Sequence, residues 1–195
     1  MRTDAGFTLT ELMLTLAVAG ILAAIAVPNM RTFILNNRLS GASNDLLRSF
    51  QIARSEAIKR QRDVVVCASD DPTAAIPVCS YGPFKGWVVF EDTNSNWQAD
   101  KDEAVVERHG LLDSNLLVRT DQDGIESYSS SGFAKPTDGV KTPTRTIVIC
   151  DQRGIAALNG SSLGRALLIG QTGRTRITKD PDQVTAAAGL AGSCP

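Results

Sequence analysis

An apolar run near the N-terminus, extending from Phe7 to Val27 and ending at Pro28, constrains this chain more than any other feature. At about 1.5 Å of rise per residue, a helix of this length can cross the hydrocarbon core of a membrane. The run holds one ionisable side chain, Glu11, close to its start. A carboxylate inside hydrocarbon is costly and normally marks a function that involves a partner group. We therefore predict a membrane-spanning helix over residues 7–28 in which Glu11 has a specific role.

The residues around Glu11 suggest what that role is. The segment GFTLTE, residues 6–11, resembles the prepilin signal of type IV pilins and type II secretion pseudopilins, which read G-F-T-L-x-E at this place. The resemblance implies that a prepilin peptidase removes residues 1–6 by cutting after Gly6, and that the new terminal amine of Phe7 is methylated. It also implies a partner for Glu11, namely the positive N-terminal amine of a neighbouring subunit in a filament.

Pro28 fits the same resemblance, because family members have a proline where the first helix loosens in the filament, and proline removes a helix hydrogen bond. Two other interpretations of the apolar run explain less of the sequence. A secretory signal peptide would need a small-x-small cleavage site after the apolar run, and none follows Val27. A plain membrane anchor explains the hydrophobicity, but it does not explain why Glu11 lies so close to the Gly6-Phe7 pair.

Composition limits what the rest of the chain can be. The chain has 195 residues, of which 43% are hydrophobic, and this suits one soluble domain of moderate size beyond the anchor. The formal net charge is −1. A protein with this charge does not coat nucleic acid over its whole surface, so any affinity for DNA must come from a local basic patch.

Four cysteines, an even number behind a membrane anchor, fit an oxidising compartment outside the inner membrane. Four cysteines allow three disulfide connectivities. Proximity in the sequence favours a bond between Cys67 and Cys79, which leaves Cys150 to pair with Cys194. A metal site is poorly supported, because the chain has no Cys-x-x-Cys motif and His109 is its one histidine.

Apolar residues recur at steps of three and four after Pro28, which predicts an amphipathic helix over residues 29–62. The stripe consists of Leu35, Leu39, Ala42, Leu46, Phe50, Ala53 and Ala57. Joined to the membrane segment, this makes one long N-terminal helix whose apolar face needs a sheet to cover it.

Beyond residue 62 the hydrophobic period changes to two, which is typical of strands. We predict eight of them, at residues 64–68, 86–91, 104–108, 115–119, 125–129, 144–150, 165–170 and 174–178. The connections at 121–124 and 135–139 are too short for crossover helices, so the sheets should be mostly antiparallel meanders. The expected fold class is therefore α+β, with a long N-terminal helix packed on a β-rich head at residues 63–195, and the pilin resemblance implies the same.

The loop from Asp92 to Glu103 places oxygen-bearing side chains at positions 1, 3, 5, 9 and 12 of an EF-hand-like calcium loop. Trp97 stands at the sixth position, where that loop needs glycine because a positive φ is unfavourable for a bulky residue. We therefore favour an Asx-rich turn between two strands.

A second motif lies near the C-terminus, where Gly173, Arg174 and Arg176 are followed by Lys179. Two arginines at i and i+2 on an extended segment share one face, and arginine can bind phosphate oxygens bidentately. The motif resembles the C-terminal G-R-x-R of the GspH/FimT family of pilin-like proteins, whose FimT-type members bind DNA during natural transformation. The resemblance implies a site for double-stranded DNA at these residues.

Two observations weigh against that DNA site. Arg-x-Arg alone is a weak signal whose default interpretation is a solvated edge strand. Asp180 and Asp182 follow Lys179 and would dilute a basic patch.

The resemblance as a whole implies a minor type IV pilin, inserted in the inner membrane with a periplasmic head and later incorporated into, or priming, a surface pilus. Its partners would be other pilin subunits, the prepilin peptidase and possible DNA ligands. A pseudopilin of the GspH kind in type II secretion is the alternative, and a FimU-type assembly initiator cannot be separated from a FimT-type DNA receptor. No catalytic motif is present, so we expect no enzymatic activity, no cofactor and no metal.

Overall fold

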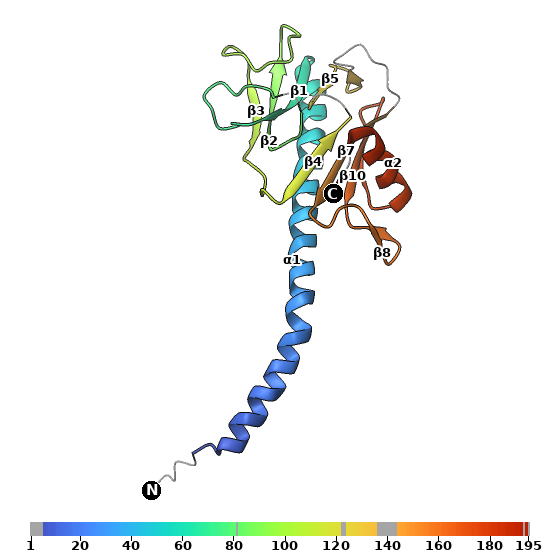
Figure 1. Ribbon diagram of the computed structural model, residues 1–195. Helices are drawn as coiled ribbons and strands as arrows, with labels where there is room; N and C mark the ends of the chain where they lie inside the picture. The colour runs from blue at the N-terminus through green and yellow to red at the C-terminus, as the bar shows by residue number, and fades with distance from the viewer. Residues whose placement is uncertain (1–5, 81, 122–123, 136–143, 193, 195) are drawn as a thin grey trace. The chain divides into compact units, whose positions relative to one another are not determined.

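The computed structural model describes residues 6–80, 82–121, 124–135, 144–192 and 194 (Figure 1). The chain divides into two compact units, Met1–Arg38 and Leu39–Pro195, which are described separately. Helix α1, Leu9–Arg60, contributes to both. It ends two residues earlier than predicted, because Gln61 adopts a left-handed conformation with φ of 56°, a common way to terminate a helix.

The first unit consists of the N-terminal part of α1. Its most apolar stretch has a mean hydropathy of 2.1, and α1 is the one helix among the described residues that is long and apolar enough to cross a membrane. The side chains from Leu9 to Val27 are exposed to the surroundings. The helical conformation continues through Pro28.

In the second unit, the remainder of α1 presents the predicted apolar stripe to the core. Every member of the stripe from residue 39 onward is buried. The indole Nε1 of Trp87 donates a hydrogen bond of 2.8 Å to Ser49 Oγ on the helix. Phe50 packs edge-on against Tyr128 at 6.3 Å between ring centroids. The helix is therefore fixed to the sheets by apolar packing and by a buried polar contact.

Two antiparallel sheets make up most of the head. The first has the order β3-β2-β1-β5-β6, and the second β11-β10-β7-β4. The strands of the first are β1 Asp63–Ser69, β2 Gly86–Asp92, β3 Val105–His109, β5 Ile125–Tyr128 and β6 Ala134–Lys135. Those of the second are β4 Leu116–Thr120, β7 Thr144–Asp151, β10 Arg165–Gly170 and β11 Thr175–Thr178. A small hairpin, β8 Ala157–Leu158 and β9 Ser161–Ser162, lies between β7 and β10 in the chain.

All eight predicted strands are present and their pairings are antiparallel, but the prediction of simple meanders is wrong. Strand β4 follows β3 yet joins the second sheet, and β5 then returns to pair with β1 in the first. A buried ion pair between Arg145 on β7 and Glu126 on β5 links the two sheets. The two short connections on which the prediction rested, at 121–124 and 135–139, include residues 122–123 and 136–139, which lie outside the described part of the chain.

The C-terminal tail, for which no structure was predicted, forms helix α2, Pro181–Ala191. Its buried residues Val184, Ala187, Ala188 and Ala191 pack on Val148 and Ala166 of the second sheet. The structure pairs Cys67 with Cys79 and Cys150 with Cys194, the connectivity that proximity favoured. The second disulfide fastens the end of the chain to β7 just beyond α2.

The loop between β2 and β3 is the expected Asx-rich turn. The amide N–H of Asn96 donates to Asn94 Oδ1 at 3.1 Å, and that of Gln98 donates to Asn96 Oδ1 at 2.8 Å. Trp97 nevertheless has φ of 59°, so the argument that a bulky residue would avoid this conformation here was wrong. The Asp92 carboxylate, which accepts the N–H of Trp97 at 3.2 Å, helps to hold it there. Burial raises the pKa of Asp92.

Candidate functional site

The first candidate site is the start of α1. The N–H and the hydroxyl of Thr8 donate to Glu11 Oε2 at 2.9 and 2.8 Å, and the N–H of Glu11 donates back to Thr8 Oγ1 at 3.3 Å. This reciprocal arrangement is a capping box, in which the residue before the helix and the third helical residue satisfy each other's backbone donors. In the single chain, therefore, the Glu11 carboxylate already has a partner, Thr8. The S/T-x-x-E spacing of Thr8 and Glu11 signals a capping box in the sequence, although the box was not predicted.

Of the other predicted residues in this region, Gly6 and Phe7 are exposed and precede the first turn of the helix. The rest of the leader, residues 1–5, lies outside the described part of the chain. Exposed, non-helical backbone is the kind of segment that proteases cleave most readily. The structure thus leaves the Gly6-Phe7 bond accessible immediately before the capped helix.

The second candidate site is the arginine motif, which lies at the edge of the second sheet. Among the strands that the structure describes, β11 pairs with β10 alone, so its other edge has no partner within that part of the chain. Arg174 and Arg176 are both exposed, and among the described residues neither forms an ion pair. Lys179 is exposed just beyond the strand. Three cationic side chains therefore face solvent within one short segment.

Thr175 explains why the two arginines point outward. Its hydroxyl lies 3.1 Å from the hydroxyl of Tyr128 on β5, and burial raises the pKa of Tyr128, so this phenol stays neutral and able to hydrogen-bond. Because successive side chains on an extended segment alternate between its faces, an inward Thr175 turns its two neighbours outward. Arg176 lies opposite Leu168 of β10, which packs on the α2 side of the sheet. The arginines thus share the face of the sheet that carries α2.

Gly173 has a conformational role rather than a contact role. It is buried, and its φ of 75° lies in the left-handed region. A Cβ at this position would lie 2.1 Å from the carbonyl oxygen of Gly132, in the turn between β5 and β6. That oxygen accepts a 3.0 Å hydrogen bond from Arg54 Nε of α1. Only glycine lets the β10–β11 turn approach so closely, and this packing positions Arg174.

The two aspartates that were expected to dilute the patch have different environments. Asp180 is the N-cap of α2, and its Oδ1 accepts the N–H of Gln183 at 2.9 Å. Its charge is therefore directed at the positive end of a helix dipole. Asp182, in the first turn of α2, is exposed. The sequence signal for this helix start was Asp180-Pro181, a capping residue followed by proline.

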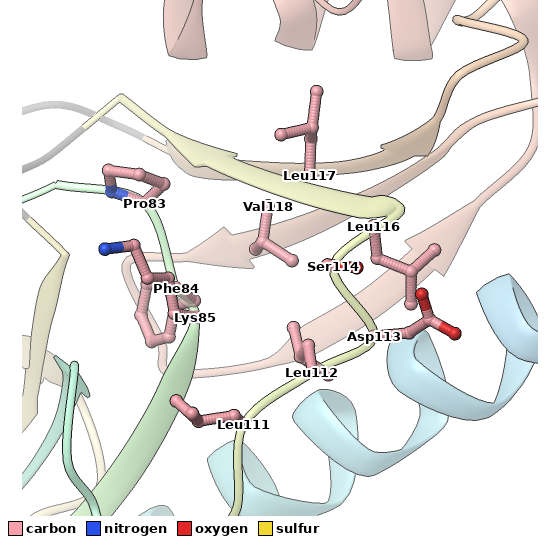
Figure 2. A pocket seen from close by; sticks show the side chains of 10 residues that line it. All are labelled: Pro83, Phe84, Lys85, Leu111, Leu112, Asp113, Ser114, Leu116, Leu117 and Val118. Atoms are coloured by element: carbon pink, nitrogen blue, oxygen red, sulfur yellow. The ribbon is translucent and has the colours of Figure 1, made fainter.

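An apolar groove of about 370 Å³ lies beside β4 (Figure 2). Figure 2 shows Leu117 on the opposite side of β4 from Val118, which points toward the groove. Two charged residues, Lys85 and Asp113, belong to its lining, and Lys85 Nζ lies 2.8 Å from Asp70 Oδ1. The full lining is Pro83, Phe84, Lys85, Leu111, Leu112, Asp113, Ser114, Leu116, Leu117 and Val118. None of the predicted site residues lines it, and no group of three potential metal ligands occurs among the described residues.

Comparison with known families gives two matches. Residues 42–173 match the family described as type II transport protein GspH. Residues 1–27 match the prokaryotic N-terminal methylation motif. Together these matches cover both candidate sites apart from Arg174, Arg176 and Lys179, which lie just past the end of the first match.

Two fimbrial proteins and one minor pilin of known structure are similar to this chain. The chain is 33% identical over 73 residues to a fimbrial protein of Pseudomonas aeruginosa, an alignment of 37% of this chain and 47% of that protein. It is 35% identical over 95 residues to fimbrial protein EcpC of Eikenella corrodens, covering 49% and 60%. The chain thus spans about half the length of these relatives. The crystal structure of the type IV minor pilin FimU of Pseudomonas aeruginosa has the same fold, with a TM-score of 0.53 and 24% identity over 77% of this chain and 94% of that one.

Proposed function

Because the chain belongs to the GspH family of pilin-like proteins and carries an N-terminal methylation motif, we propose that it is a minor type IV pilin. The observation that carries the proposal is the combination of that motif with a capped, membrane-length helix leading into a pilin-like head. The chain would lie in the inner membrane with a periplasmic head, and prepilin peptidase would cut it after Gly6. Methylated at Phe7, it would then join other pilin subunits in a pilus.

The two fimbrial relatives support a pilus as the destination. A pseudopilin of the type II secretion system is the second candidate, and the description of the matching family favours it. Both candidates share the processing and assembly residues Gly6, Phe7, Glu11 and Pro28. They differ in the machine that recruits the subunit, so the filament in which the protein is found decides between them.

Processing is tested by replacing Gly6 with leucine in cells that carry prepilin peptidase. A bulky residue before the cut should block cleavage, leaving a membrane-bound precursor six residues longer, with Phe7 unmethylated. Mass spectrometry of the N-terminal peptide measures both. Gly20→Leu is the matched control, because a Cβ at Gly20 meets nothing within 4 Å and the site is distant from the junction. The proposal fails if Gly6→Leu yields the same mature N-terminus as the wild type.

We further propose that the protein binds DNA, and this is supported by Arg174 and Arg176, which point outward and form no ion pair with any described residue. Duplex DNA offers the same phosphate charge everywhere, so binding would be weak and independent of sequence. Changing both arginines to glutamine removes two positive charges, and we expect most of the affinity to be lost. The slope of log K against log salt should fall by roughly two units.

The measurement is fluorescence anisotropy with the full-length protein in detergent and a labelled duplex. The matched control also removes two exposed charges, through Lys85→Gln and Lys101→Gln, outside the motif. Equal binding by the double arginine variant and the wild type would assign the motif to a solvated edge or a subunit contact.

A further inference from the structure

Phe133 is a large aromatic side chain that the head leaves 53% exposed. It lies in the turn between β5 and β6, where the N–H of Ser129 donates to its carbonyl oxygen at 2.9 Å. Core packing therefore does not account for an aromatic residue at this position. Nor does the turn itself require one, because its hydrogen bonds use the backbone. The residues next to Phe133 in the chain suggest that its side chain serves in binding.

Both neighbours of Phe133 contact the turn that carries the arginine motif. The carbonyl oxygen of Gly132 lies against Gly173, as described above. The N–H of Ala134 donates to the carbonyl oxygen of Gln171 at 3.1 Å. Phe133 is thus held beside the β10–β11 turn, from which Arg174 and Arg176 extend. Helix α1 supports the arrangement from within, because Arg54 binds the Gly132 carbonyl.

An exposed aromatic residue, on a turn that packs against the turn carrying two exposed arginines, suits one class of ligand in particular. In a single strand no partner strand holds the bases in the stack, so their faces open easily to a protein, and each base stacked on an aromatic ring adds affinity with little dependence on sequence. In a duplex those faces are covered by neighbouring base pairs. Arginines on the adjoining turn can bind the phosphates of such a strand, and their planar groups can also stack on bases.

We propose that Phe133, Arg174 and Arg176 form a site for single-stranded DNA, in which the arginines hold phosphates and Phe133 stacks on a base. The site rests on the proposed DNA binding and names its preferred form of DNA. A neighbouring protein subunit is the other conceivable occupant, since Ile58, which lies against Gly132, is also 44% exposed. Arg174 and Arg176 are exposed and form no ion pair with the residues that the structure describes, which favours a polyanion over an apolar protein surface.

The test compares single-stranded and duplex DNA of about 12 nucleotides, a length within the usual site sizes of roughly 4–16 nucleotides. Affinity is measured by fluorescence anisotropy with the full-length protein in detergent. We expect the wild type to bind the single strand about tenfold more tightly than the duplex. Phe133→Ala should remove that preference, weakening single-strand binding about tenfold while leaving duplex binding and the salt dependence unchanged. Phe133→Trp, which keeps an aromatic face, should retain the preference.

Two controls separate stacking from general damage. Leu158→Ala shortens an equally exposed apolar side chain in the β8–β9 hairpin and should alter neither affinity. Arg174→Gln with Arg176→Gln should weaken binding to both forms of DNA. The inference is overturned, with the proposed DNA binding intact, if the wild type binds both forms equally and Phe133→Ala changes neither. If the wild type binds neither form, the DNA function itself fails. Normal single-strand binding with reduced incorporation of Phe133→Ala into filaments would identify Phe133 as a subunit contact.

Discussion

At the scale of single residues, Gly173 is where the arginine motif depends most directly on backbone conformation. Replacing it with alanine places a side chain at φ of 75° and a Cβ 2.1 Å from the Gly132 oxygen, so the two turns must separate. A left-handed non-glycine residue costs about 1–2 kcal/mol, and the clash adds to this. We expect Gly173→Ala to lower the free energy of unfolding by about 2 kcal/mol or more. Tryptophan fluorescence during urea unfolding measures it, because both tryptophans, Trp87 and Trp97, lie in the head.

The matched control is Gly189→Ala in α2, where an added Cβ meets nothing within 4 Å and φ is not positive. There the same substitution should stabilise the protein by about 0.5–1 kcal/mol, because alanine favours a helix interior. Equal effects of the two substitutions would show that Gly173 is not conformationally required. If the protein binds DNA as proposed, the affinity of Gly173→Ala for DNA should also fall, since separation of the two turns would move Arg174 from its place beside the strand.

At the scale of elements, Asp180 caps the N-terminus of α2, and this capping can be tested apart from the charge of the aspartate. Asp180→Ala removes the acceptor of the Gln183 N–H and should cost about 1 kcal/mol of unfolding free energy. Asp182→Ala removes the same charge from the exposed first turn and should cost less, about 0.3 kcal/mol, through the helix dipole alone. Urea unfolding distinguishes the two variants, and an equal cost for both would contradict the capping role.

The elements also show what the sequence could and could not predict. Strands and the α1 stripe were predictable because alternating or helical burial imposes a period on nearby residues. Strand partners were not, since nothing in the local sequence of β4 or β5 identifies the sheet that the strand joins. That choice depends on contacts between residues distant in sequence, such as the ion pair of Arg145 with Glu126. Helix α2 was predictable in principle, because Val184, Ala187, Ala188 and Ala191 recur at helical spacing after an aspartate and a proline.

The candidate sites show the same division. The local motifs at Gly6 to Glu11 and at Gly173 to Arg176 could be recognised from neighbouring residues alone. The contacts that hold the arginine motif in place could not be predicted, because Tyr128 and Gly132 are distant in sequence from the arginines that they position. The position of Trp97 is a further example, since the Asp92 carboxylate holds a backbone conformation that residue preference alone disfavours.

At the scale of the whole molecule, recruitment into a filament depends on what the Glu11 carboxylate binds. In the single chain it binds Thr8 in a capping box, whereas the pilin resemblance assigns it the amine of a neighbouring subunit. These two roles are separable. Glutamine also completes a capping box but carries no charge, so Glu11→Gln preserves the first role and removes the second. Thr8→Val does the reverse, because it removes the capping hydroxyl and keeps the carboxylate.

If charge pairing recruits the subunit, Glu11→Gln should be inserted in the membrane and cut after Gly6 at the normal level, yet be depleted from filaments. Its insertion should be easier than that of the wild type, because the apolar run then holds no ionisable side chain. Thr8→Val should reach filaments normally. The measurement is the ratio of this subunit in sheared filaments to that in whole cells, by immunoblot, with N-terminal mass spectrometry to confirm cleavage. Normal incorporation of Glu11→Gln together with loss of Thr8→Val would assign Glu11 to helix capping, and a membrane-embedded carboxylate would then serve the fold of its own chain rather than assembly.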